Sequence, residues 1–150
     1  MKTKETIEIL GILAIIGSLI FVGIEIRQNS LQIKSATYQS VSEQVNKLYM
    51  AIASDEKLSE LVSELMVKDS LRNELNATDQ IRLDFIVLTG CRRVENIYLQ
   101  KLDGILSTKA FDRIDLEFYR RPYSIQAWEK YKTGFDSSFI DFFEELRDSK

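Results

Sequence analysis

Apolar positions divide the chain into one continuous run and a series of amphipathic segments. Residues 9–24 read ILGILAIIGSLIFVGI and carry no charge, so the helix they would form is apolar on every side. At about 1.5 Å per residue the run covers roughly 24 Å, and Ile7 and Ile26 extend it towards the ~30 Å hydrocarbon core of a bilayer. The run predicts a transmembrane helix with Glu8 and Glu25 at the interfaces, and membrane lipid as a partner.

Two other readings of this run stay open. A cleaved signal peptide would carry a basic n-region and a small-x-small cleavage site, whereas here Glu5 and Glu8 precede the run and residues 21–25 (FVGIE) offer no such site. A buried core helix of a soluble protein is the other reading, because the run is slightly shorter than a usual span. The transmembrane helix is the preferred interpretation.

Small residues occupy one face of the predicted span. Gly11, Ala14 and Ser18 lie at i, i+3 and i+7, which would allow a second helix to approach closely. Because such residues are also common in spanning helices generally, the pattern alone does not decide between a helix-association face and ordinary composition.

The segment 27–52 continues the pattern as a stalk-like helix. Neither glycine nor proline occurs between Gly23 and Gly90, and apolar residues recur every seven positions from Ile24. This seam could pair copies of the stalk, or it could pack on the chain's own domain, which is the preferred reading because Ser35 and Ser42 weaken a coiled coil. The seam residues are Leu31, Tyr38, Val41, Val45, Leu48 and Ile52.

Five further amphipathic segments follow, at about 55–68, 79–102, 108–119, 124–134 and 136–146. Ser54 is the expected N-cap of the first, Asp103-Gly104 ends the second, and Ser124 begins the fourth. The resulting fold class is all-α: an N-terminal transmembrane helix that continues into a long helix, followed by a small helical bundle. The predicted domains are residues 1–26 and 27–150. The expected core-facing stripe of 79–102 consists of Ile81, Phe85, Leu88, Cys91, Val94, Tyr98 and Leu102.

The composition excludes several kinds of chemistry. The chain has no histidine and one cysteine, so it lacks the usual general base, Ser-His or Cys-His nucleophiles and ordinary zinc sites. No glycine opens a phosphate-binding loop, and a net charge of −3 argues against nucleic-acid binding. We therefore expect no catalysis, no cofactor and no metal. Glu95 and Asp84 are the carboxylates on which an enzyme would have to rely, and Glu95 is expected to pair with Arg92 on the surface.

Aromatic residues gather in the last third of the chain. Such a cluster could line a ligand pocket, but it more often forms the core between short helices. The unpaired Cys91 slightly favours a reducing compartment and hence a cytoplasmic domain. The aromatic residues are Phe111, Phe118, Tyr119, Tyr123, Trp128, Tyr131, Phe135, Phe139, Phe142 and Phe143.

Three sets of residues give the chain a likeness to known sequences. They are Phe21-Val22-Gly23 followed by Arg27-Gln28-Asn29, the central Arg93-x-Glu95-Asn96-x-Tyr98, and the late residues Trp128, Tyr131 and Phe135. On these motifs the chain resembles a group of small bacterial single-pass membrane proteins with an N-terminal transmembrane helix. The resemblance implies a bacterial inner-membrane setting and supplies no activity or catalytic residues.

Two functional interpretations remain. The first is a membrane-anchored helical interaction or scaffold protein that self-associates as a homo-oligomer and presents its domain to a protein partner. The alternative is a subunit of a homo-oligomeric pore whose mouth is formed by Glu25 and Arg27.

Overall fold

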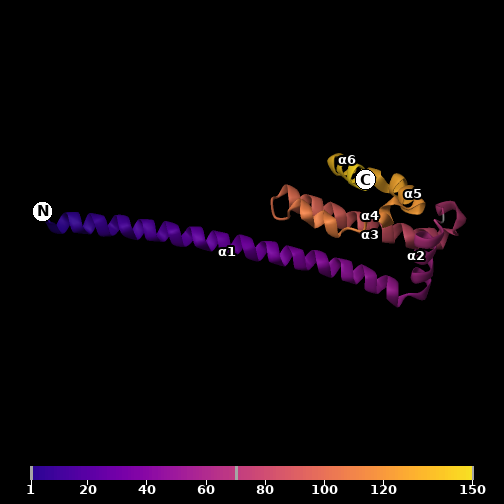
Figure 1. Cartoon of the computed structure of the whole chain (residues 1–150), viewed down its shortest axis with the longest axis horizontal. Coiled ribbons are helices and arrows are strands. Elements are labelled where there is room, and N and C mark those ends of the chain that lie inside the picture. Colours follow the sequence, from indigo (N-terminus) through magenta and orange to yellow (C-terminus); the bar gives the residue numbers. More distant parts are fainter. Residues whose placement is uncertain (1, 70, 150) are drawn as a thin grey trace. The chain divides into compact units, whose positions relative to one another are not determined.

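The computed structural model describes residues 2–69 and 71–149. Residues 1, 70 and 150, which include the outer ends of the two predicted domains, lie outside the described residues. The described part contains helices and no strand, which confirms the all-α prediction (Figure 1). The chain divides into two compact units, Met1–Tyr38 and Gln39–Lys150. We refer to the second unit as the helical domain; the predicted boundary at residue 26 marks the end of the apolar run and stays a prediction.

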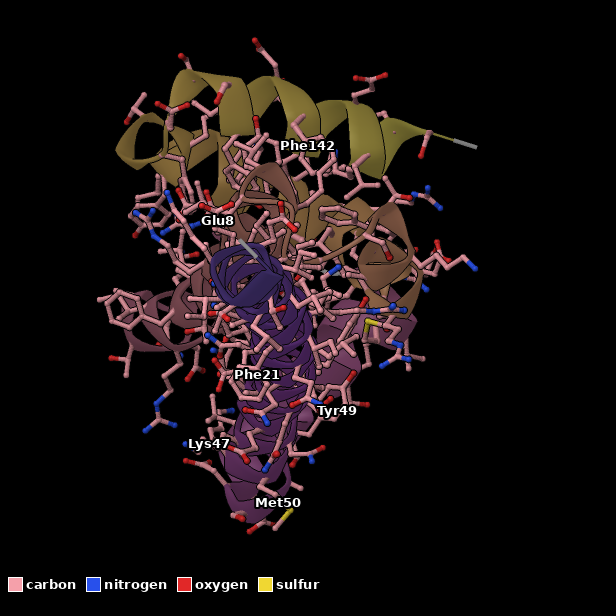
Figure 2. All side chains as sticks on the ribbon, turned by 90° about the vertical axis from the view of Figure 1, so that its left-hand side faces the viewer. Glu8, Phe21, Lys47, Tyr49, Met50 and Phe142 are labelled. Carbon is pink, nitrogen blue, oxygen red and sulfur yellow. The ribbon has the colours of Figure 1, made fainter. Side chains whose placement is uncertain are left out.

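The first helix, α1 (Lys2–Ser54), is continuous, as the absence of glycine and proline after the apolar run predicts. It is long and apolar enough to cross a membrane, and none of the side chains in its most apolar stretch is buried in the fold. Figure 2 shows Glu8 and Phe21 projecting outward from the α1 ribbon. The helix is therefore compatible with a single-pass membrane protein.

A sharp corner separates α1 from α2 (Glu56–Lys68). Asp55 is the N-cap of α2, and its Oδ1 accepts a hydrogen bond of 3.0 Å from the Leu58 backbone N–H. The prediction of Ser54 as the cap was wrong by one residue because both side chains are capable acceptors. Ser59 Oγ donates to the Ile52 carbonyl at 2.7 Å, which uses a carbonyl that the end of α1 leaves free.

The central helix α3 (Ala77–Leu102) begins at the N-cap Asn76 and ends at Asp103, where Gly104 adopts a left-handed backbone with φ 69°. Its predicted core-facing stripe is wrong in part. Ile81, Phe85 and Leu102 are exposed, whereas Cys91, Val94 and Tyr98 are buried as expected. The buried residues of α3 are Asp79, Leu83, Asp84, Ile86, Val87, Gly90, Cys91, Val94, Ile97 and Tyr98.

Short helices complete the domain. They are η1 (Arg72–Glu74), η2 (Thr108–Arg113), α4 (Leu116–Arg120), α5 (Pro122–Tyr131), η3 (Lys132–Gly134) and α6 (Ser137–Asp148). Pro122 is the first residue of α5, where its missing N–H and fixed φ are compatible with a helix, so the prediction that Ser124 begins this helix was two residues late. Asp136 caps α6, within the predicted range.

The aromatic residues of the last third form the core. Trp128 has its ring centroid 5.0 Å from that of Phe135 and 4.6 Å from that of Phe143, and it also contacts Phe139 edge-on at 6.2 Å. All four side chains are buried, so α5 and α6 are held together mainly by these rings. Most of the predicted aromatic cluster is core, as preferred, and two of its members, Phe118 and Tyr119, also line a cavity.

Candidate functional site

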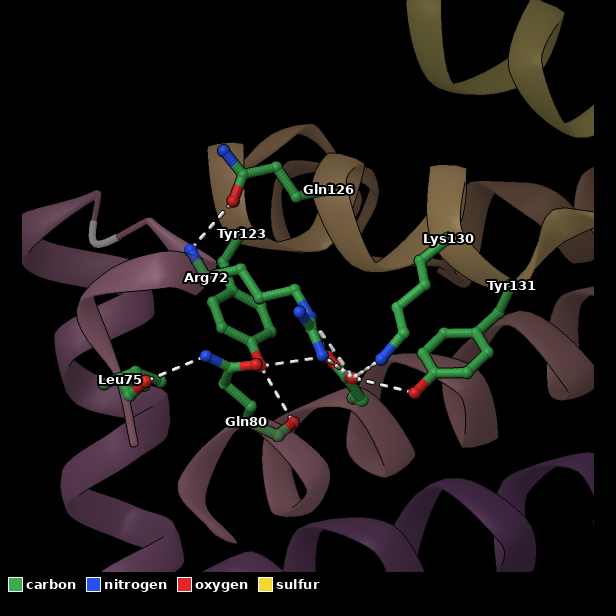
Figure 3. A network of polar contacts seen from close by, with 8 residues as sticks. Arg72, Leu75, Gln80, Tyr123, Gln126, Lys130 and Tyr131 are labelled. Carbon is green, nitrogen blue, oxygen red and sulfur yellow. Dashed lines mark hydrogen bonds and ion pairs between the residues drawn. The ribbon is translucent and has the colours of Figure 1, made fainter. Parts of the chain in front are cut away.

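A buried carboxylate lies at the junction of η1, α3 and α5. Asp84 is fully buried, and Arg72 binds it through Nε at 3.0 Å from Oδ1 and Nη2 at 2.8 Å from Oδ2 (Figure 3). The Tyr131 hydroxyl donates to Oδ2 at 3.0 Å, and Lys130 Nζ is 3.5 Å from the same oxygen. The Tyr123 hydroxyl lies 3.0 Å from Oδ1. Both oxygens of the carboxylate are thereby paired, which a buried charge requires.

Backbone contacts extend this network to its neighbours. The Arg72 N–H donates to Gln126 Oε1 at 2.8 Å, and Gln80 Nε2 donates to the Leu75 carbonyl at 2.8 Å (Figure 3). The Tyr123 hydroxyl is also 2.9 Å from the Gln80 carbonyl oxygen. The network thus ties the segment between α2 and α3 to α3 and α5.

The electrostatics of Asp84 oppose a catalytic role. Burial raises the pKa of its carboxyl, but hydrogen bonds from Arg72, Tyr123 and Tyr131 outweigh burial and hold the pKa below its usual value of 3.8. A carboxylate that is ionised, fully paired and enclosed can neither take a proton near neutral pH nor touch a substrate. We interpret the cluster as a structural lock. No signal in the sequence joins Arg72 to Asp84 and Tyr131, because they come from three separate elements.

A cavity of about 440 Å³ lies elsewhere in the helical domain, bounded by the last turns of α1, by α2, α3 and α4. Its lining is mostly apolar, with Arg93 as the one basic and Asp115 as the one acidic side chain among the described residues that line it. The volume falls within the ~300–1,000 Å³ of small-molecule sites. The lining residues are Leu48, Tyr49, Ile52, Ala53, Ser59, Val62, Ser63, Met66, Ile86, Gly90, Arg93, Asp115, Phe118 and Tyr119.

Three residues shape the α3 wall of this cavity. A Cβ on Gly90 would overlap the Tyr119 hydroxyl and lie 3.2 Å from two of its ring carbons, so only glycine allows Tyr119 to lie against α3 here. Arg93, one turn later, has a buried Nε that finds no hydrogen-bond partner among the described residues. Burial raises the pKa of the Tyr119 hydroxyl, and the neighbouring positive charge of Arg93 offsets part of that rise. The cavity therefore contains a cation that its protein surroundings satisfy incompletely.

The residues predicted as sites are placed as follows. Gly11, Ala14 and Ser18 share an exposed face of α1, and a Cβ on Gly11 would meet nothing within 4 Å. Glu25 and Arg27 are exposed, so the pore mouth stays a prediction. Of the seam, Leu31 is exposed, Tyr38 is half-buried, and Val41, Val45, Leu48 and Ile52 are half-buried within the helical domain. Leu48 and Ile52 line the cavity, which agrees with a seam that packs on its own domain.

Two further predictions concern single residues. Arg92 Nη1 donates to Glu95 Oε2 at 2.8 Å, which confirms the expected pair. Cys91 is fully buried, and burial raises the pKa of its thiol to about 12, so this cysteine is a small core residue and a poor nucleophile.

The comparisons do not add a relative to this picture. No family model, curated protein or solved structure matches the chain. The described residues contain no group of three or more acidic or cysteine side chains that could hold a metal ion. The class that the fold defines is an all-α protein with one candidate membrane span, and the resemblance to bacterial membrane proteins stays a prediction.

Proposed function

We propose that the chain is a non-enzymatic, membrane-anchored interaction protein whose copies associate with one another. Residues 9–24 would anchor it in a bacterial inner membrane, with the helical domain in the cytoplasm. The observation that carries this proposal is apolar surface that the fold leaves uncovered at two places, the span itself and one face of α3. Uncovered apolar patches of this kind are typical of membrane or protein contacts.

The second place is the α3 stripe, which we define as Phe85, Leu88, Arg92, Glu95, Leu99 and Leu102. Its positions alternate by three and four residues, as in the seam of a paired helix. Phe85, Leu99 and Leu102 are exposed by 61%, 51% and 58%, so the fold of a single copy does not use them.

This stripe is complementary to itself in an antiparallel arrangement. The pairs Phe85 with Leu102, Leu88 with Leu99 and Arg92 with Glu95 share one midpoint, between Arg93 and Val94. Two copies packed through this stripe, related by a two-fold axis at that level of α3, would bring apolar residues against apolar residues and opposite charges against each other. A second copy is therefore the occupant that best fits the stripe.

Charge exchange tests the stripe. In the full-length protein in mild detergent, Arg92→Glu would place like charges across the two-fold axis and weaken association by about tenfold or more, measured by native mass spectrometry. The double exchange Arg92→Glu with Glu95→Arg should restore association, because it restores opposite charges both within and between copies. Equal association of all three proteins would contradict the antiparallel dimer.

A separate substitution tests the span. Gly11→Ile fits a single copy without a clash, so its effect should fall on helix approach alone, raising the dissociation constant about tenfold. Gly23→Ile is the matched control, since Gly23 lies on a different side of α1 and also has open space around it. If both variants associate like the original chain, the face of Gly11, Ala14 and Ser18 does not pair copies.

A further inference from the structure

The cavity beside Arg93 has a mostly apolar lining, and Arg93 is the one cation in it among the described residues. Leu48, Val62, Met66 and Phe118 contribute from three different helices, α1, α2 and α4, and the unbranched thioether of Met66 adapts readily to an irregular chain. Such a wall favours a flexible hydrocarbon over a polar metabolite. A folded peptide helix is about 10 Å across, and a cavity of about 440 Å³ is too small to enclose one.

The polar requirement comes from Arg93. No carboxylate among the described residues lies within 4.0 Å of its guanidinium, and its buried Nε lacks an acceptor. A buried donor of a charged group is costly when it is unsatisfied, and a carboxylate matches the guanidinium fork with two oxygens. An acid group on the ligand would give the guanidinium of Arg93, which lines the cavity, the anionic partner that no described carboxylate supplies.

We propose that this cavity binds a single-chain amphiphile with a carboxylate head, such as a fatty acid. Its head group pairs with Arg93, close to the Tyr119 hydroxyl, and its chain lies along the apolar residues of α1, α2 and α4. Asp115 also lines the cavity and makes no ion pair with Arg93, so its negative charge disfavours the head group at its own end. This site is independent of the surfaces proposed for self-association.

Photolabelling of the full-length protein in phosphatidylcholine nanodiscs tests the site. The probe is lauric acid carrying a diazirine on its chain, and the comparison probe is the alcohol of the same chain. We expect the acid to label peptides containing residues 48–66 about tenfold more than the alcohol does, because only the acid pairs with Arg93. Labelling confined to residues 9–24 would show bilayer partition alone and would overturn the proposal.

Three variants make the result specific. Arg93→Gln should reduce labelling by the acid to the level of the alcohol, Arg93→Lys should retain part of the difference, and Asp115→Asn should increase labelling by the acid. Ala53→Trp lies on the exposed end of α1 and fills the cavity, so it should abolish labelling by both probes even if Arg93→Gln fails to fold. Acid labelling that survives Ala53→Trp, or that is unchanged in a folded Arg93→Gln variant, would refute the site.

Discussion

Replacing Trp128 with alanine is expected to lower the free energy of unfolding of the helical domain by about 3–5 kcal/mol. The indole is 1% exposed and contacts three phenylalanine rings, and its Nε1–H donates to Glu144 Oε1 at 2.9 Å. The substitution would leave a large cavity between α5 and α6 and remove that hydrogen bond. Since domains of this size are stable by only about 5–15 kcal/mol, much of the stability would be lost.

Cys91 provides the measurement for this prediction. It is the single cysteine and is fully buried, so the rate at which a thiol reagent labels it in urea reports opening of the helical domain without a signal from α1. Trp128→Phe, which keeps an aromatic ring and loses the N–H donor, should cost about 1–2 kcal/mol. Val67→Ala, at an exposed position, should change stability by less than about 0.5 kcal/mol. A Trp128→Ala variant as stable as Val67→Ala would contradict the aromatic core.

The helices of this fold could be predicted where the evidence is local. The length of α1 follows from an apolar run without glycine or proline after it, and the ends of α3 and α6 follow from Asn76, Gly104 and Asp136 acting on their own neighbours. The start of α5 was misplaced because Arg120-Arg121-Pro122 reads as a stop, whereas proline is equally suited to the first position of a helix.

The orientation of α3 could be predicted only in part. The helix carries two apolar stripes, and spacing alone does not tell which one faces the core. Asp84 on the buried face made that side look polar, while Phe85 beside it is exposed. The hydrogen-bond partners of Asp84 are Arg72, Tyr123 and Tyr131, which are 12, 39 and 47 residues away in the sequence, so no local pattern joins them. The cavity at Arg93 was missed for the same reason, since four separate helices form it.

The Asp84 network makes the second large prediction. Arg72→Met removes the two donors that hold the carboxylate and leaves it fully buried beside two tyrosines and the more distant Lys130. Breaking a buried pair in this way costs about 3–5 kcal/mol at neutral pH. Asp84→Asn removes the anion of the pair instead of the cation and should cost less stability, because the Arg72 side chain is 21% exposed and can be hydrated in part.

The dependence on pH distinguishes this explanation from a simple loss of packing. In the original chain the pKa of Asp84 is below 3.8, so the stability it contributes is present above about pH 4 and is lost as the pH falls through the lower pKa of the folded state. In Arg72→Met, burial becomes the dominant influence and raises the pKa of Asp84 above that of the unfolded chain. The folded variant then binds a proton more readily than the unfolded one, and lowering the pH should narrow the gap in stability between the two proteins.

Unfolding curves from pH 7 to pH 3, followed by the fluorescence of Trp128, which is the single tryptophan and is buried in the helical domain, would measure this gap. Lys130→Met is the matched control, because it removes a second cation, 3.5 Å from Asp84 Oδ2. The side chain of Lys130 is 45% exposed, so its loss should cost less than about 1 kcal/mol of stability. The double variant Arg72→Met with Asp84→Asn should be more stable than Arg72→Met alone, since it removes the unpaired buried charge. A gap that stays constant from pH 7 to pH 3 would show that Arg72 stabilises the domain through its packing and not through the Asp84 carboxylate.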